Sequence, residues 1–181
     1  MNPLQSPYWE YFEHLATAFA ENEQAIEVIN QAAAMQGSKA RDSLLCMDYC
    51  AALQLSPTHL DDEKTIILEQ GYHYFLTQIE AYEMSGTAAI PCFISVRDDM
   101  QETELSGGPL VQGQPQNDRG LIELYAGFQS YNQRVLQTPR HYFRYLGDRG
   151  IVKVRAKINA PDTKKIEVIL SGWKINLGGL S

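Results

Sequence analysis

The sequence predicts an α+β fold in which an N-terminal bundle of about four helices packs on a C-terminal antiparallel β-sheet. Across residues 5–85, apolar side chains recur every three or four positions, as on one face of a helix. Across residues 87–180 the apolar period changes to two, which is typical of half-buried strands. The two patterns are segregated along the chain, which argues against a doubly wound parallel sheet. Because no linker rich in Pro and Gly divides them, we expect residues 1–181 to form a single domain.

Four apolar rows define the predicted helices. The first two helices are short, and the second ends near Gly37, a common helix terminator. The third spans residues 39–55 and stops before Pro57, because the residue preceding a proline avoids helical geometry. The fourth begins at the acidic residues 61–63, which favour a helix N-terminus, and ends at Gly86. The rows are Trp9, Phe12, Ala16 and Phe19; Ile26, Ile29 and Ala33; Leu44, Met47, Ala51 and Leu55; and Leu68, Tyr72, Phe75, Ile79 and Tyr82.

Strand patterns follow after Gly86. Residues 90–96 place Ile90, Cys92, Ile94 and Val96 at every second position, as in a strand, and residues 120–128 form a second strand. Between them, residues 98–120 form a long loop rich in Gly and Pro, and loops of that length are either functional or disordered. Residues 129–146 fit either strand or helix, and Pro139 interrupts both alternatives.

The C-terminal residues predict an antiparallel hairpin with one apolar and one basic face. Residues 152–158 alternate strictly, and turn-forming residues 160–163 separate them from a second apolar run that starts at Ile166. Gly172 marks a bulge, because the apolar phase shifts after it. Strict alternation predicts that one set of side chains is buried and the other is exposed or paired with carboxylates. The buried set is Val152, Val154, Ala156 and Ile158, and the exposed set is Lys153, Arg155 and Lys157.

Charge is divided unevenly along the chain. Residues 1–118 hold 4 Lys/Arg against 18 Asp/Glu, whereas residues 119–181 hold 11 Lys/Arg against 4 Asp/Glu. The two parts therefore either face different partners or complement each other within one molecule. The sequence has no apolar run long enough to span a membrane and no secretory signal pattern, and three Cys do not suggest a disulfide framework. The expected location is the cytoplasm.

The basic C-terminal region has the composition of a surface for single-stranded nucleic acid or another anionic partner. Lys and Arg contact phosphates, and exposed aromatic rings stack on unpaired bases. The competing interpretation is a solvated sheet face, or one covered by the acidic helices, and the net charge of −7 opposes binding by the whole chain. The candidate residues are Arg140, Tyr142, Arg144, Tyr145, Arg149, Lys153, Arg155 and Lys157.

Other chemistry-bearing residues match no specific motif. The acidic loop residues Asp98, Asp99, Glu102 and Glu104 lack calcium-loop spacing and are predicted to be solvated. The three cysteines, Cys46, Cys50 and Cys92, are predicted to pack in the core, and His73 to pack beside the fourth helix. Nuclease-like acidic residues next to a Lys occur only at a helix start, 62–64, and in the hairpin turn, 162–164.

The leading functional hypothesis is a non-catalytic protein-binding, adaptor or assembly protein, whose partners include its own copies. It rests on the charge division, the ten Tyr and two Trp, and the long loop available for contact. It predicts an exposed apolar or aromatic patch rather than a deep polar pocket. The alternative is a nucleic-acid-binding accessory protein, and the third hypothesis is an enzyme whose residues converge only in three dimensions. No cofactor, metal or membrane partner is expected.

Overall fold

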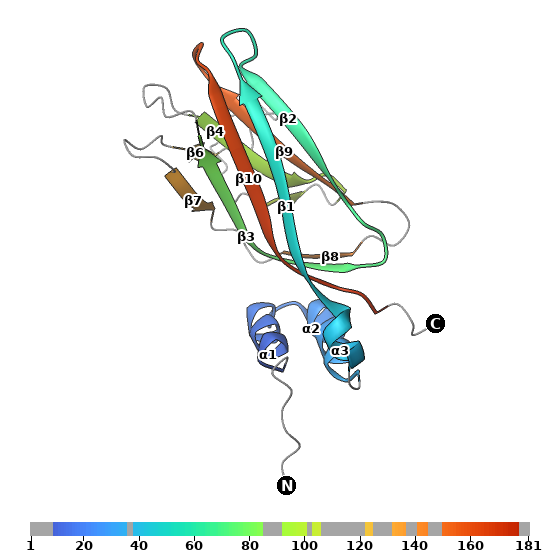
Figure 1. Ribbon diagram of the computed structural model, residues 1–181. Coiled ribbons are helices and arrows are strands. Elements are labelled where there is room, and N and C mark those ends of the chain that lie inside the picture. The colour runs from blue at the N-terminus through green and yellow to red at the C-terminus, as the bar shows by residue number, and fades with distance from the viewer. Residues whose placement is uncertain are drawn as a thin grey trace.

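The protein is a β-sandwich with a small helical layer at one end (Figure 1). The computed structural model describes residues 9–35, 38–84, 92–100, 103–105, 122–124, 132–136, 141–144 and 150–177. Within these residues, ten strands form two antiparallel sheets, and three short helices precede them. The prediction of a four-helix bundle on one sheet is therefore wrong, and the fold is mostly β.

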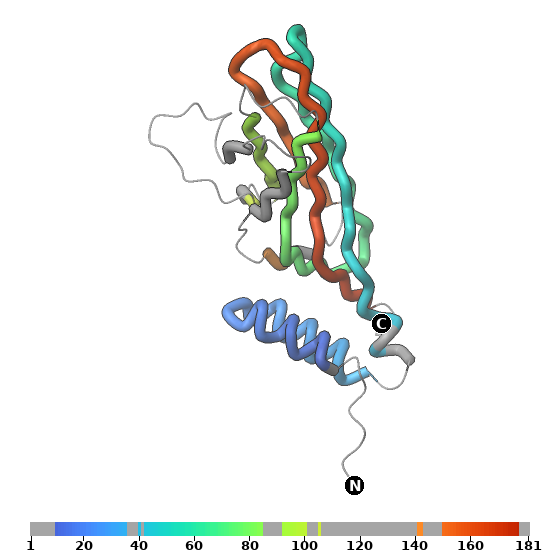
Figure 2. Tube along the Cα trace, turned by 60° about the vertical axis from the view of Figure 1, so that its left-hand side comes forward, coloured from blue at the N-terminus to red at the C-terminus, as the bar shows by residue number. Residues whose placement is uncertain are grey.

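The helical layer contains α1 (Trp9–Ala18), α2 (Glu23–Ala33) and the short α3 (Ser38–Ser43). The side chain of Asn22 caps α2 by accepting a hydrogen bond from the Ala25 N–H at 3.0 Å. The first two predicted helices are thus confirmed. Figure 2 shows the helices lying together beneath one end of the sandwich.

The first sheet has the order β1-β10-β3-β7, and β8 also pairs with β3. Its strands are β1 (Leu44–Leu55), β10 (Lys164–Ile175), β3 (His73–Glu83), β7 (Asn132–Leu136) and β8 (His141–Arg144). All its pairings are antiparallel.

The second sheet has the order β2-β9-β4-β5, and β6 also pairs with β4. Its strands are β2 (Asp61–Leu68), β9 (Gly150–Ile158), β4 (Cys92–Asp98), β5 (Thr103–Glu104) and β6 (Ile122–Leu124). The two sheets bury one shared core, which takes side chains from β1, β3 and β10 on one side and from β2, β4 and β9 on the other.

The predicted third and fourth helices are strands in the structure. Residues 44–55 form β1, and residues 61–83 form β2 and β3 around a turn. A spacing of four residues satisfies a helical period and a strand period alike, so the row Met47, Ala51, Leu55 fits both. The turn is made by Gly71, whose φ of 82° lies in the left-handed region that glycine adopts without strain.

The C-terminal strands do not form the predicted hairpin. Strand β9 pairs with β2 and β4 in the second sheet, whereas β10 pairs with β1 and β3 in the first. Residues 159–163 therefore cross from one sheet to the other. The face split on β9 is confirmed, because Val152, Val154, Ala156 and Ile158 are all buried in the core between the sheets.

Only part of the central region, for which strands and a long loop are predicted, lies within the described residues. The strand predicted at residues 90–96 is confirmed by β4, and β6 lies within the predicted strand 120–128. Residues 103–104 of the predicted loop 98–120 form β5, and the described parts of 129–146 are strands β7 and β8. The remaining residues of these ranges lie outside the described part of the chain.

A second apolar cluster joins the helices to the outer face of the first sheet. Helices α1 and α2 contribute side chains to it, and Phe75 of β3 and Ile175 of β10 meet them from the sheet. The Phe75 ring lies 5.2 Å, centroid to centroid, from the Phe19 ring of the turn that follows α1. The sheet thus changes its buried face near Gly172. Among the described residues, the part of the sheet far from the helices buries only its inner face, whereas next to the helices the outer face is buried as well.

A pairing irregularity between β10 and β3 marks this change of face. Ser171 pairs with Gln78 and Gly172 pairs with Leu76, so Thr77 is an extra residue on β3. The bulge predicted near Gly172 is thus present, although the additional residue belongs to the neighbouring strand. None of the described helices is long and apolar enough to cross a membrane.

Candidate protein-binding site

The predicted basic row lies on the outer face of the second sheet. Its members, Lys153, Arg155 and Lys157, occupy alternate positions of β9. The register places acidic residues of β2 directly beside two of them, Asp61 opposite Lys157 and Glu63 opposite Arg155. The acidic neighbours therefore come from the same sheet rather than from the helices.

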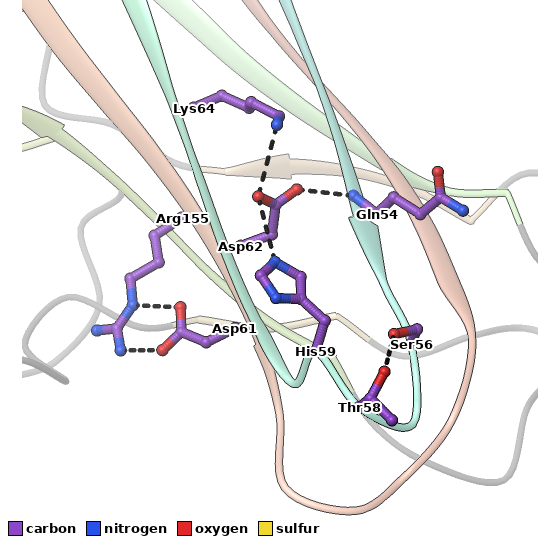
Figure 3. A network of polar contacts seen from close by, with 8 residues as sticks. All are labelled: Gln54, Ser56, Thr58, His59, Asp61, Asp62, Lys64 and Arg155. Carbon is purple, nitrogen blue, oxygen red and sulfur yellow. Dashed lines mark hydrogen bonds and ion pairs between the residues drawn. The ribbon is translucent and has the colours of Figure 1, made fainter.

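Two residues of the basic row form ion pairs. Arg155 donates two hydrogen bonds to Asp61, one of them from Nε to Oδ1 at 2.8 Å (Figure 3). Lys153 Nζ lies 3.2 Å from Asp99 Oδ2. The Arg155 hydrogen bond lowers the pKa of Asp61 below its usual value of 3.8, against the opposing effect of burial. Carboxylates of the same molecule therefore neutralise Arg155 and Lys153, two of the basic groups that would have to contact the phosphates of a nucleic acid.

The Asp61–Arg155 pair predicts a specific loss of stability in acid. Because the folded-state pKa of Asp61 is lowered, its contribution is complete above 3.8 and is lost as the pH falls through the folded value. We expect Asp61→Asn to remove this part of the acid dependence, measured as urea unfolding midpoints from neutral to acidic pH. Glu63→Gln is the matched control, because Glu63 makes no ion pair with a described residue. Equal acid dependence in the two variants would contradict the assignment.

The aromatic part of the predicted surface lies elsewhere. Tyr142 belongs to the first sheet, where its hydroxyl is hydrogen-bonded to His73 Nδ1 at 2.8 Å and its ring lies 5.2 Å from the Phe75 ring. The structure therefore does not bring Tyr142 together with the basic row of β9. Arg144 belongs to β8, and its side chain lies outside the described part of the chain. The other three candidates, Arg140, Tyr145 and Arg149, also lie outside it.

The acidic loop residues make protein contacts where they are described. Asp98 is fully buried, accepts a hydrogen bond from the Met100 N–H at 3.0 Å and lies 3.2 Å from His141 Nε2. Asp99 pairs with Lys153. The expectation of a solvated cluster is therefore wrong for Asp98. Glu102 and the side chain of Glu104 lie outside the described residues, and the described residues contain no group of three or more potential metal ligands.

The cysteines divide between surface and core. Cys92 is buried as predicted, and burial raises the pKa of its thiol to about 12. Cys46 and Cys50 are exposed on the outer face of β1, so the core prediction is wrong for both. Burial and a hydrogen bond to Glu167 at 3.0 Å raise the pKa of Cys50 to about 11. His73 is buried as predicted, although it lies on a strand.

An aromatic groove of about 350 Å³ opens where the helices meet the first sheet. Tyr11 of α1 is 48% exposed and Leu45 of β1 is 38% exposed, which are high values for large apolar side chains. The Tyr11 ring lies 5.5 Å from the Trp173 ring of β10, at an angle of 55°. The lining residues are Tyr11, Phe12, Ala40, Asp42, Leu44, Leu45 and Trp173. We call this the aromatic groove.

Acidic residues outnumber basic ones in the helices at the aromatic groove, although α3 carries Lys39 and Arg41 beside Asp42. Asp42 is its single charged lining residue within the described part of the chain. The adjoining helical residues 9–35 contain five Glu and no Lys or Arg. This arrangement can hold an apolar side chain against Tyr11 and Trp173 while attracting basic groups around it. The position of the groove could not be predicted from the sequence, because its walls come from segments about 160 residues apart.

Comparisons with known proteins identify no family. No family model matches the chain, and no curated protein matches it. One structure with detectable similarity is the "Structure of a family two carbohydrate esterase from Cellvibrio japonicus", at 7% sequence identity and a TM-score of 0.32. The match covers 74% of this chain and 36% of that chain, so the chain spans about a third of the length of that structure.

Proposed function

We propose that this protein is a non-catalytic protein-binding module that holds an apolar side chain of a partner polypeptide in the aromatic groove. The observation that carries the proposal is the exposure of Tyr11 and Leu45 beside Trp173. Exposed aromatic rings in a preformed hollow are typical anchor points of protein interfaces, because they bury large area with little loss of side-chain entropy.

The charge around the groove specifies the chemistry of the partner. Helices α1 and α2 carry only acidic formal charges, and Asp42 of α3 is the charged residue at the groove itself. Lys39 and Arg41 of α3 offset part of this negative charge, and the three helices together remain acidic. A complementary segment therefore carries one apolar anchor flanked by Lys or Arg. The described lining side chains are aromatic or aliphatic apart from the Asp42 carboxylate. This composition favours a binding role over a catalytic one.

The nucleic-acid alternative stays a prediction. The ion pairs of Arg155 and Lys153 favour the protein-binding proposal over it, because they engage two of the three basic groups on β9. The proposed location is still the cytoplasm, supported by three cysteines that are all free.

The test is selection from a random-peptide library displayed on phage. We expect the wild-type protein to select peptides with an apolar residue flanked by Lys or Arg, and Tyr11→Ser to bind them about tenfold more weakly or worse. Ile67→Ser is the matched control, because Ile67 is 53% exposed but lies on β2, away from the groove. Failure to select any peptide, or equal loss in both variants, would contradict the proposal.

A further inference from the structure

We propose that the free edge of β1, from Cys46 to Ala52, binds an extended segment of the partner as an additional strand. This inference rests on the proposed function and specifies its binding mode. Strand addition supplies affinity through main-chain hydrogen bonds, whereas neighbouring pockets for side chains supply specificity. The aromatic groove lies at the beginning of the same strand, since Leu44 and Leu45 line it.

Strand β1 is paired on one side only within the described part of the chain. All its residues pair with β10 in one uninterrupted register, from Leu44 opposite Ile175 to Leu55 opposite Lys164. At its C-terminal end the chain turns from β1 into β2, and the bridge between Ser56 and His59 closes that turn. Figure 1 shows β1 and β2 separating from that end toward the helices.

The polar groups of this edge follow a simple alternation. The Gln54 N–H points away from β10, because it donates to Asp62 Oδ2 at 2.9 Å (Figure 3). In an antiparallel strand, alternate residues direct both N–H and C=O to the same side. Residues 46, 48, 50 and 52 therefore present their groups to the same edge as Gln54. Among the described residues, no backbone hydrogen bond outside the β1–β10 ladder involves them.

This edge lacks the features that usually prevent pairing with another chain. Natural edge strands are often short, bulged or marked by Pro and Lys. By contrast, β1 has twelve residues without Pro, Lys, Arg or a register shift to β10. The side chains beside the free groups are small or short: Cys46, Asp48, Cys50 and Ala52.

The occupant that the charges favour is a basic segment of another protein. Asp48 is the one charged residue of β1, and helices α1 and α2 carry Glu but no Lys or Arg, whereas α3 carries Lys39 and Arg41 beside Asp42. A second copy pairing antiparallel through residues 46–52 would bring the two Asp48 carboxylates close together between molecules that each carry a net charge of −7, which like charges oppose. A partner strand with Lys or Arg beside Asp48 meets no such repulsion, and its apolar anchor can enter the aromatic groove.

The first experiment compares Cys50→Pro with Cys50→Ala in the phage-displayed peptide selection. Proline removes the N–H at the centre of the free edge but no ladder bond to β10, so the fold is expected to tolerate it. Both variants lose the thiol contact with Glu167, so the hydrogen-bonding group in which they differ is the edge N–H. We expect Cys50→Pro to bind the selected peptides about tenfold more weakly than Cys50→Ala, with similar thermal unfolding.

The outcomes separate this inference from the proposed function. Peptides that depend on Tyr11 but bind Cys50→Pro as well as Cys50→Ala would retain the groove and overturn the strand addition. Selection of no peptide would overturn both proposals. A dimer in sedimentation equilibrium that dissociates in Cys50→Pro but not in Cys50→Ala would replace the basic partner with a second copy.

Amide hydrogen exchange of the wild-type protein gives an answer even if Cys50→Pro fails to fold. We expect the amides of residues 46, 48, 50 and 52 to exchange rapidly in the free protein and to slow at least about tenfold with a selected peptide. The amides of residues 47, 49 and 51, which face β10, are expected to be slow in both states. Unchanged exchange at the even-numbered positions with peptide bound would overturn the inference.

Discussion

Replacing Gly172 with Ala is expected to lower the free energy of unfolding by about 3 kcal/mol, at the upper end of what overpacking usually causes. A Cβ atom at this position would lie 2.0 Å from the Phe75 carbonyl oxygen and 3.1 Å from Leu76 Cα. Both are backbone atoms of β3, so no side-chain rotation relieves the overlap. The measurement is equilibrium unfolding in urea, with the midpoint converted to free energy through the slope.

The sign of this prediction opposes the general propensity of the two residues. Glycine within a strand is ordinarily destabilising by about 0.5–1 kcal/mol relative to alanine, because it loses more backbone entropy on folding. Steric overlap with β3 reverses that preference at Gly172. Ser171→Ala is the control, since Ser171 is the adjacent residue and already carries a Cβ. A Gly172→Ala protein as stable as wild type would show that β3 and β10 separate easily at the bulge.

Phe75 explains why the close approach at Gly172 matters. Its carbonyl lies against β10, and its ring packs in the cluster that joins the helices to the sheet. Any shift of β3 that accommodates a new methyl group therefore also moves the Phe75 ring against Phe19 and Tyr142. The bulge thus couples the sandwich core to the helical layer and, through it, to the wall of the aromatic groove.

Sequence patterns identified the elements in which one period was unambiguous. On β9, charged residues occupy every second position from Lys153 to Lys157, so no helical face is compatible with the pattern, and the buried face is as predicted. On β1 the row Met47, Ala51 and Leu55 steps by four residues, which helices and strands share. On β3 the predicted helical row joins Phe75 and Ile79, which lie on opposite faces of the strand with the extra residue Thr77 between them. The residue that distinguishes two strands from one helix in this region is Gly71, which forms a turn between β2 and β3 within the predicted fourth helix.

The change of buried face could not be predicted from either pattern. The apolar phase shift after Gly172 suggests an inserted residue on β10, but the pairing with β1 continues without interruption. The side chains of Trp173 and Ile175 point to the outer face because the helices cover that face there. Whether a sheet face is covered depends on a layer distant in sequence. The aromatic groove is formed between the helices and the first sheet, so it could not be predicted from the sequence patterns either.

Lys164, which the sequence pattern places in a hairpin turn, is completely buried in the structure. Lys164 begins β10, and its Nζ lies 3.2 Å from Asp162 Oδ2. Glu83, at the end of β3, is only 4% exposed and, like Lys164, acts electrostatically on Cys92. The end of the sandwich far from the helices therefore contains a buried cationic group with acidic neighbours.

Lys164→Met is expected to lower the free energy of unfolding by about 3–5 kcal/mol, because it leaves buried acidic groups without their cation. Lys165→Met is the matched control: Lys165 is the next residue, carries the same charge and is exposed. Unfolding in urea of wild type, both variants, Asp162→Asn and the Lys164→Met/Asp162→Asn double variant measures the coupling. Asp162→Asn should cost less in the Lys164→Met background than in the wild type, because its ion pair has already been lost. If Lys164→Met and Lys165→Met unfold at the same urea concentration, the buried charges do not stabilise the sandwich, and methionine packing replaces the lysine at no net loss.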